Sequence, residues 1–264
     1  MSSQRPQGPH SFRVVIPARF ASTRLPGKAL LPIAGKPMLQ WVYERARAAG
    51  AHEVLIATDD ARIGSAARAF GAEPVMTAST HASGTDRIAE VARARRWPHD
   101  DIVVNVQGDE PLIPPAVISQ VAQLLAAHPD AQLATLATPL ESLEELLDPS
   151  VVKVVSDTQG YALYFSRAPI PWNREGAATG LASQRDFAGA RRHLGIYAYR
   201  VAELLRLAQL PHGRLEEREK LEQLRALEHQ LRIVVGDALE RPGPDVNTLA
   251  DLERVSALLD PLPP

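Results

Sequence analysis

Short runs of aliphatic, β-branched residues alternate with amphipathic segments through the first half of the chain, and this alternation limits the possible folds most. Buried strands are predicted at Phe12–Pro17, Glu53–Thr58 and Ile102–Val106, with a shorter one near Glu73–Met76. Helices are predicted between and after them, at residues 38–49, 61–70, 83–96 and 114–127. Strands and helices that alternate in this way form βαβ units and a mostly parallel sheet. The expected fold class is therefore α/β.

The second half of the chain has a different pattern. Strands are predicted at residues 151–156, 161–166, 193–199 and 231–235, and helices at 216–229 and 249–259. Residues 173–192 are rich in glycine, alanine and charged residues, so we expect a mobile excursion there. This half of the chain therefore departs from the regular alternation of the first half.

Composition excludes several classes of function. The net charge is −2 and no long run of one sign occurs, which argues against general DNA or RNA binding. The sequence has no cysteine, so disulfides, thiolate metal sites and cysteine nucleophiles are excluded. No apolar run approaches the roughly 18 residues that span a bilayer. Residues 1–10 are polar and lack the apolar stretch of a signal peptide, so we expect a cytoplasmic protein that binds no membrane.

The loop at residues 17–28 follows the first predicted strand and carries three cations, Arg19, Arg24 and Lys28, among small residues. Ligands of parallel α/β sheets bind beyond the carboxyl ends of the strands. Free backbone N–H groups beside cations make a cradle for polyphosphate. Neither G-x-x-x-x-G-K-[ST] nor G-x-G-x-x-G is present, so this is a different kind of phosphate loop. The alternative from spacing alone is a solvated loop with incidental arginines.

Asp109 follows the predicted strand at 102–106 and a glycine, in the segment Gln107-Gly108-Asp109-Glu110-Pro111. Mg²⁺ prefers a few carboxylates together with phosphate oxygens, so Asp109 is a candidate ligand and Glu110 is its neighbour. A solvated turn is the alternative. In the second half, Arg167, His193 and Gln223 are candidates for holding an anionic sugar, because arginine suits carboxylates. Each of these three, taken alone, could equally be a surface or core residue.

The chain resembles the 3-deoxy-manno-octulosonate (Kdo) cytidylyltransferase family over about residues 12–257. The resemblance rests on an ordered set of segments, of which any one could occur by chance: IPARFASTRLPGK (16–28), GKPM (35–38), ATDD (57–60), HASGTDR (81–87), VNVQGDEP (104–111), VKVV (152–155), YALYFSRAPIPW (161–172), HLGIYAYR (193–200), LEQLRAL (221–227) and DLERV (251–255).

The resemblance implies a glycosyltransferase-A-like nucleotidyltransferase fold, with a central, mostly parallel mixed sheet flanked by helices. It implies a nucleotide-binding lobe at residues 12–150 and a smaller portion at 151–259 for sugar binding and dimerisation, within one continuous domain. Residues 1–11 are expected to form a disordered tail. The implied partners are CTP, Kdo and a second copy of the chain, with Mg²⁺ as cofactor. The implied reaction gives CMP-Kdo and diphosphate, for lipopolysaccharide biosynthesis.

The resemblance also implies roles for individual residues. The catalytic set would be Arg19, Lys28 and Asp109, with Asp109 on Mg²⁺. The triphosphate and cytosine would be held by Ala18, Arg19, Ser22, Arg24, Lys28, Ser83, Arg87 and Gln107. The sugar acid would be held by Arg167, His193, Glu222 and Gln223.

One position departs from the family pattern. The family usually carries V-D-T before the last helix, with the aspartate as a metal ligand, and this chain has Val246-Asn247-Thr248. Asparagine offers a carbonyl oxygen without charge, so Mg²⁺ binding should weaken. Asp245 lies two residues earlier and points to the same side if the segment is extended. We expect Asn247 still to coordinate the metal, directly or through water.

Three alternatives stay open. A cytidylyltransferase for 8-amino-Kdo would share almost all of these motifs, and a sialic-acid enzyme would share the nucleotide loop. A nucleotide-binding regulatory protein with an impaired metal site would account for Asn247, although the retention of Arg19, Lys28 and Asp109 argues against it. A structural protein would leave the polar loops at the strand ends unexplained.

Overall fold

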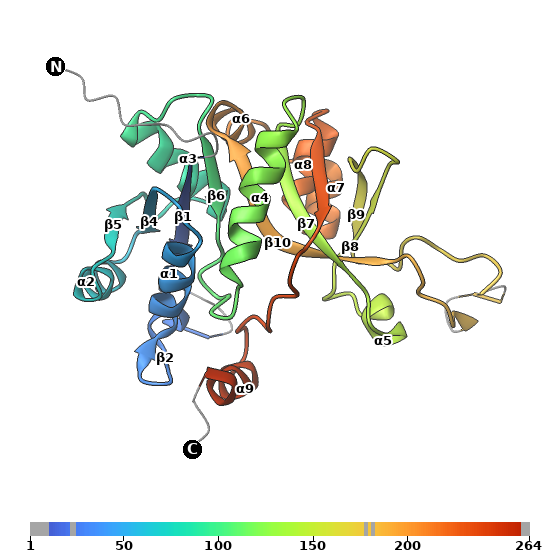
Figure 1. Ribbon diagram of the computed structural model, residues 1–264, viewed down its shortest axis with the longest axis horizontal. Coiled ribbons are helices and arrows are strands. Elements are labelled where there is room, and N and C mark those ends of the chain that lie inside the picture. The colour runs from blue at the N-terminus through green and yellow to red at the C-terminus, as the bar shows by residue number, and fades with distance from the viewer. Residues whose placement is uncertain (1–10, 22–24, 177–178, 181–182, 260–264) are drawn as a thin grey trace.

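The computed structural model describes residues 11–21, 25–176, 179–180 and 183–259 (Figure 1). Its main sheet runs in the order β11-β7-β10-β6-β1-β4-β5, with β8 beside β10 and β9 beside β8. The strands are β1 (Phe12–Ala18), β4 (Glu53–Thr58), β5 (Glu73–Met76), β6 (Ile102–Asn105), β7 (Leu133–Pro139), β8 (Lys153–Ser156), β9 (Ala162–Ser166), β10 (Arg191–Arg200) and β11 (Ile233–Asp237). A separate small sheet pairs β2 (Pro32–Ile33) with β3 (Lys36–Pro37).

Strand direction confirms the predicted α/β class. Pairings β1–β4, β1–β6, β4–β5 and β7–β11 are parallel. Strand β10 is antiparallel to both β6 and β7, and so joins the parallel strands of the first half to the pair β7–β11. The sheet therefore runs without a break through both portions of the chain.

Helices cover both faces of the sheet (Figure 1). One face packs against α1 (Met38–Ala48), α2 (Ala61–Ala69) and α4 (Pro115–Ala127). The other face packs against α3 (Gly84–Arg95), α6 (Val201–Leu207) and α8 (Gln223–Glu228). Alternation along β1 explains the division, because Val14 and Ile16 belong to the first core and Val15 to the second. Three short elements complete the fold: η1 (Lys28–Leu30), which adds Ala29 to the first core, α5 (Leu143–Leu147), and α7 (Arg214–Glu219), which contacts α8.

Two segments differ from the sequence-based expectation. Strand β7 was not predicted, although it pairs with β10 on one side and β11 on the other. The single helix predicted at 216–229 is two helices, α7 and α8, because the chain turns at Lys220, which has a φ of 54°. That turn brings Arg225 back onto Glu216, with Nη2 and Oε1 2.6 Å apart, and both side chains are buried.

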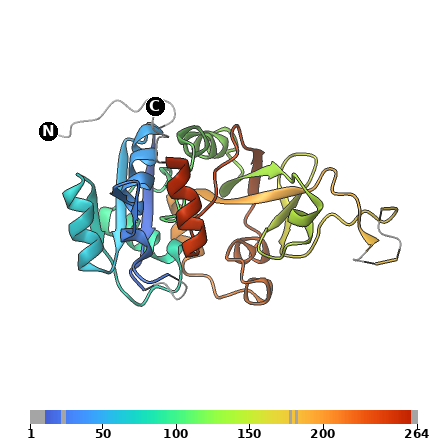
Figure 2. The same cartoon turned by 90° about the horizontal axis from the view of Figure 1, so that it is seen from below.

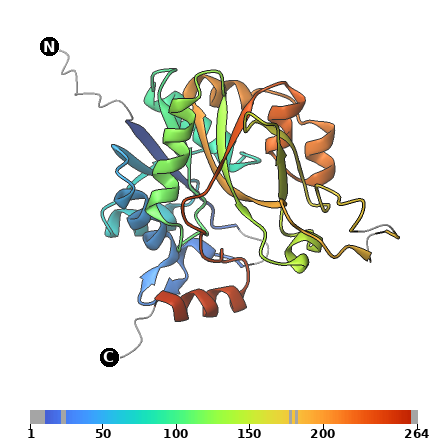
Figure 3. The ribbon, with the colours of Figure 1, turned by 45° about the vertical axis from the view of Figure 1, so that its right-hand side comes forward.

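The last helix, α9 (Leu249–Leu259), lies apart from the layers and beside β2 (Figure 3). Seen from below, it lies in front of the junction between the early strands and the second half of the chain (Figure 2). Val246 and Val255 are fully buried there against Leu25, Ile33 and Met38. Thr248 Oγ1 accepts the N–H of Asp251 at 3.2 Å, as the predicted helix cap requires. The C-terminal segment thus crosses from β11 to the loop that follows β1.

Candidate active site

The carboxyl ends of β1 and β6 bring two polar loops together. The strands are parallel neighbours, so residues 17–28 and 107–110 leave the sheet at the same edge. A Cβ atom on Gly108 would lie 3.0 Å from the carbonyl oxygen of Pro17. A side chain at this position would push the two backbones apart by a few tenths of an ångström, so Gly108 allows the close spacing of the loops.

Lys28 and Asp109 meet across this gap. The ammonium of Lys28 donates to Asp109 Oδ2 at 2.6 Å and to Asn247 Oδ1 at 3.3 Å. Asn247 Nδ2 donates to Asp245 at 2.5 Å, and the backbone N–H of Val246 donates to the Asp109 carbonyl at 2.9 Å. The C-terminal segment therefore completes the charge arrangement that begins at β1 and β6.

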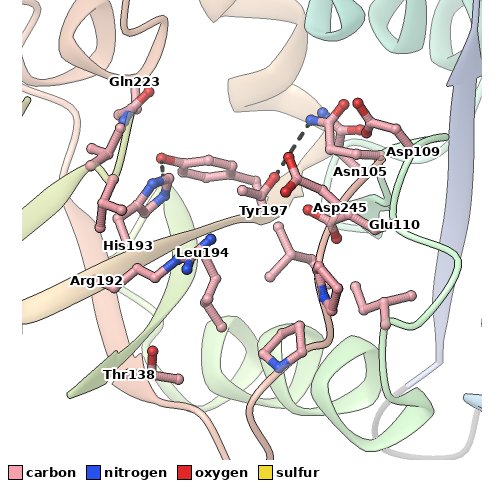
Figure 4. Close-up of a pocket in the computed structure, with 18 of the residues that line it drawn as sticks. Asn105, Asp109, Glu110, Thr138, Arg192, His193, Leu194, Tyr197, Gln223 and Asp245 are labelled. Atoms are coloured by element: carbon pink, nitrogen blue, oxygen red, sulfur yellow. Dashed lines mark hydrogen bonds between the residues drawn. The ribbon is translucent and has the colours of Figure 1, made fainter. Parts of the chain in front are cut away.

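A cavity of about 770 Å³ opens beside this cluster (Figure 4). Its walls come from α3, the loop after β6, β10, the start of α8, the segment at 241–245 and α9. The polar lining residues include Thr85, Asn105, Gln107, Asp109, Glu110, Thr138, Ser150, Arg192, His193, Tyr197, Tyr199, Glu222, Gln223, Arg241, Asp245 and Arg254. Asp109, Glu110 and Asp245 gather at one end and His193 and Gln223 lie at the other, so the cavity has two chemically different ends (Figure 4).

His193 lies on β10 with its ring held by aromatic neighbours. Its Nε2 is 2.7 Å from the Tyr197 hydroxyl and 3.2 Å from Thr135 Oγ1, and its ring meets Phe165 edge to face at 5.0 Å (Figure 4). Removal from water, with a smaller effect of the nearby Arg192 cation, lowers the pKa of His193 to about 3. The imidazole is neutral at physiological pH and acts as a hydrogen-bonding group rather than as a cation.

Two carboxyl groups in the cavity favour protonation. Burial, with repulsion from Asp109 and Asp245, raises the pKa of Glu110 to about 8. Burial likewise raises the pKa of Glu222, whose Oε1 accepts from Ser83 Oγ at 3.2 Å. The bond between Ser83 and Glu222 joins the N-cap of α3 to the start of α8, so it connects the two halves of the chain beside the cavity.

The structure brings most of the predicted site residues together. Five of them line the cavity: Gln107, Asp109, His193, Glu222 and Gln223. Lys28 and Asn247 lie at its edge through their bonds with Asp109 and with each other. Arg19 Nη2 donates to the Ser83 carbonyl at 2.9 Å, so the phosphate loop reaches the N-terminus of α3.

The remaining residues of the predicted phosphate loop cannot all be placed. Ser22 and Arg24 lie outside the described residues. Ala18 is buried at the end of β1, 3% exposed, so any contact with a ligand would be made by its backbone.

Arg87 lies inside the fold. Its side chain is fully buried, donates to Thr77 Oγ1 and lies 3.4 Å from Asp59 Oδ1. Burial lowers the pKa of this guanidinium despite the attraction of Asp59. In this conformation Arg87 holds the segments after β4 and β5 together, and its contact with the cytosine stays a prediction.

Arg167 is also engaged elsewhere. Its Nε donates to the Glu219 carbonyl at 2.8 Å and its Nη1 to the Pro149 carbonyl at 2.9 Å. The buried ammonium of Lys153 donates to the carbonyls of Asp148, Val151 and Arg167 at 2.9, 2.6 and 2.7 Å. Two cations thus hold the loop at 148–151, part of which lines the cavity. In this conformation Arg167 shapes the wall, and direct contact with a sugar acid stays a prediction.

Sequence reasoning missed several lining residues, among them Arg192, Tyr197, Tyr199 and Arg241. A period-two signal was present on β10, because residues 193, 195, 197 and 199 share one face of a strand. Arg241 follows no motif and reaches the cavity only through the path of the C-terminal segment. Its partners are Glu141 at 2.7 Å and Glu145 at 2.5 Å.

Two side-chain oxygen atoms near Lys28 are candidate metal ligands. Asp109 Oδ2 and Asn247 Oδ1 both contact the same ammonium, so a carboxylate and an amide oxygen converge on one position that already holds a cation. Hard oxygen donors of this kind suit Mg²⁺, which takes its remaining ligands from phosphate and water. Within the described ranges, no group of three His, Asp or Glu side chains forms a metal cage. The donor set fits an ion that is shared with a phosphate ligand.

Across the part of the chain that the structure describes, every helix is too short or too polar to cross a bilayer.

Comparisons with known proteins agree with this geometry. The cytidylyltransferase family model matches residues 13–233. Proteins named 3-deoxy-manno-octulosonate cytidylyltransferase from Thioalkalivibrio sulfidiphilus and Cellvibrio japonicus are 56% and 57% identical, over 94% and 95% of this chain and 99% and 98% of theirs. A solved structure of CMP:2-keto-3-deoxy-manno-octonic acid synthetase with CTP is 45% identical, with a TM-score of 0.84 over 94% of this chain and 98% of that one. A Leptospira borgpetersenii cytidylyltransferase, 16% identical with a TM-score of 0.61 over 97% of this chain and 89% of that one, shares the fold.

Proposed function

The chain belongs to the cytidylyltransferase family, and from this premise we propose that it transfers CMP from CTP to Kdo and releases diphosphate. The anomeric hydroxyl oxygen of Kdo bonds to the α-phosphorus, the bond to the diphosphate breaks, and the hydroxyl proton is lost. Chemistry of this kind depends on positioning and charge neutralisation. The observation that carries the proposal is the Lys28–Asp109 pair at the mouth of a cavity whose far end holds His193 and Gln223.

The position of each site residue determines the role that we propose for it. Arg19 and Lys28 hold the triphosphate at the carboxyl ends of β1 and β6, and Lys28 offsets the charge that develops at the α-phosphate. Gln107 lines the cavity and is our candidate for a contact with the base; its Nε2 donates to the Gly195 carbonyl on β10 at 3.5 Å. The far end of the cavity takes the sugar acid.

We propose Mg²⁺ as the cofactor, held by Asp109 and Asn247. The ion, when bound, neutralises phosphate charge and polarises the α-phosphate. Asn247→Asp adds a carboxylate to the set and should lower the Mg²⁺ concentration for half-maximal rate, whereas Asn247→Ala should raise it. Direct titration of Mg²⁺ into the protein with CTP should give the same order without turnover. Unchanged Mg²⁺ dependence of Asn247→Ala would remove Asn247 from the metal site.

The defining experiment is a diphosphate-release assay with CTP, Kdo and Mg²⁺. We expect release only when all three are present, and a loss of at least about 100-fold in Asp109→Asn, as for removal of a preorganised electrostatic group. Replacing Kdo by 8-amino-Kdo or sialic acid tests the related substrates. Intact CTP binding without diphosphate release at high Mg²⁺ would favour a regulatory protein instead.

We further propose a homodimer formed through the portion at 151–259. Several large apolar side chains are exposed there, among them Leu163 on β9 at 62% and Trp172 at 42%, as expected for a surface that another chain covers. Sedimentation equilibrium should give twice the chain mass, and Leu163→Arg should lower it. We also propose a cytoplasmic location, where the enzyme would supply activated sugar for lipopolysaccharide.

A further inference from the structure

Phe20 joins the two ends of the loop that follows β1. Its backbone carbonyl accepts the N–H of Gly27 at 3.0 Å. The far edge of its ring also lies against Gly27, where a Cβ atom would be 3.1 Å from Cζ of the ring. Arg19 directly precedes Phe20 and Lys28 directly follows Gly27. The contact between Phe20 and Gly27 therefore relates the position of Arg19 to that of Lys28.

A cation from α2 covers the face of the Phe20 ring. The guanidinium carbon of Arg62 lies 3.3 Å from the ring centroid. Attraction between a guanidinium and the negative face of an aromatic ring stabilises a stack of this kind. The Arg62 side chain keeps 61% of its surface exposed, so burial in a core does not hold it over the ring. Specific contacts must therefore fix its position.

Asp60 provides these contacts. Its carboxylate accepts from Arg62 Nε at 3.0 Å and from Nη2 at 2.6 Å, and this bidentate pairing fixes the plane of the guanidinium. The hydrogen bonds from Arg62 lower the pKa of Asp60 to about 2, so the carboxylate is charged at physiological pH. The backbone N–H of Asp60 donates to the fully buried hydroxyl of Thr58 at 3.2 Å. A continuous set of contacts thus runs from the end of β4 through Asp60 and Arg62 to Phe20.

We propose that Asp60 and Arg62 position the phosphate loop through Phe20, and this inference rests on the proposed function. Arg62 is a positioning residue, because Asp60 neutralises its charge while its guanidinium plane holds the ring in place. Arg19 and Lys28 are then presented to the triphosphate at a fixed separation. A loop ordered in advance loses less conformational entropy when CTP binds, so CTP binds more tightly.

Calorimetric titration of CTP into the protein with Mg²⁺, in the absence of Kdo, tests the proposal without turnover. We expect Arg62→Gln to weaken CTP binding about 3- to 10-fold, as for loss of a cation–π contact and of the orientation that it imposes. Phe20→Leu should weaken binding by a similar factor. The double variant should bind no more weakly than either single variant, because both substitutions remove the same contact. In the diphosphate-release assay, the KM for CTP should rise and the KM for Kdo should not.

Asp60→Asn separates positioning from a direct effect of charge. Asparagine can still cap α2, but it lacks the charge that orients Arg62. The positioning role predicts weaker CTP binding by this variant. Loss of a negative charge beside the loop, acting alone, would strengthen the binding of a polyanion. Tighter CTP binding by Asp60→Asn would therefore overturn the proposal, and this comparison decides the matter if Phe20→Leu does not fold.

Two further variants serve as controls. Arg68→Gln removes an exposed cation from the last turn of the same helix and should leave CTP affinity unchanged. An equal loss in Arg68→Gln would show a general effect of charge and would overturn the role of Arg62. Phe20→Tyr keeps an aromatic ring beneath the guanidinium and should retain the affinity that Phe20→Leu loses.

The outcomes distinguish this inference from the proposed function. Absence of CTP binding, or of diphosphate release with CTP and Kdo, in the wild-type protein overturns the proposed function. Normal release by the wild type, together with losses in Arg62→Gln and Phe20→Leu that multiply in the double variant, would show two independent contacts. That result overturns the positioning role alone.

Discussion

Replacing His193 by glutamine should reduce the loss of unfolding free energy that the protein undergoes on acidification. The pKa of His193 is lowered in the folded chain to about 3, from an ordinary value of 6.5. Between these values the unfolded chain binds one more proton than the folded chain, so stability rises with pH. The contribution is present above the unfolded pKa and is lost as the pH falls from about 6.5 toward about 3.

The size of the effect follows from the two pKa values. Between about pH 7.5 and pH 5, proton uptake by an unfolded histidine of ordinary pKa lowers the free energy of unfolding by about 2 kcal/mol. The ring is partly exposed to the cavity, so water screens some of this, and we expect about 1 to 2 kcal/mol for His193.

Urea denaturation at the two pH values measures the free energy of unfolding for wild type and His193→Gln. The variant should lose less stability than the wild type on acidification, whatever its stability at neutral pH. His99→Gln replaces an exposed histidine and controls for the removal of any imidazole. Equal losses in wild type and His193→Gln would show that the imidazole is protonated in the folded chain and would refute the reasoning.

Three further substitutions probe the frame around the site. Lys153→Met leaves three carbonyls without a donor, so the free energy of unfolding measured by urea titration should fall by about 1–3 kcal/mol. Because these carbonyls belong to the cavity wall, the KM for Kdo should rise more than the KM for CTP. Arg225→Met removes the buried cationic partner of the Glu216 carboxylate and should lower the free energy of unfolding by about 3–5 kcal/mol in the same assay. Part of this loss should be recovered at low pH, where Glu216 is protonated. Gly108→Ala pushes the loop away from the Pro17 carbonyl, which misplaces the groups that position CTP. CTP affinity measured by calorimetry should therefore fall about tenfold or more. The melting temperature should shift by only a few degrees.

Sequence patterns predicted best the strands whose apolar runs end at polar loops. The β4 and β5 bounds agree with the prediction, and β1 and β6 differ by one residue at the end, because their apolar runs stop at polar loops. Strand β7 was missed because its sequence, LATLATP, has small residues and no β-branched apolar run. Its extended form depends on pairing with β10 and β11, which local propensity does not contain.

The break between α7 and α8 has a similar cause. Residues 216–229 contain neither glycine nor proline, so helix propensity runs through them. The buried pair of Glu216 and Arg225 forms only if the chain turns at Lys220, and this tertiary contact accompanies the positive φ there.

The candidate site was predicted in part for comparable reasons. Lys28, Asp109, His193 and Gln223 lie in recognisable segments, and the structure places them in or beside one cavity. The burial of Arg87 was not predicted, because the motif gives the residue and not its environment. Arg192 lies at the end of a segment rich in charge, where neither spacing nor motif distinguishes it from its neighbour Arg191.

The path of the C-terminal segment sets the order in which the site is made. The chain is synthesised from its N-terminus, so β1, β4, β5 and β6 can pair long before residue 247 exists. Until then Asp109 lacks the backbone bond from Val246, and Lys28 lacks its contact with Asn247. A chain cut short before Val246 lacks both bonds and therefore the finished charge arrangement. The site is complete only after the segment that follows β11 has been synthesised and has packed beside the loop after β1.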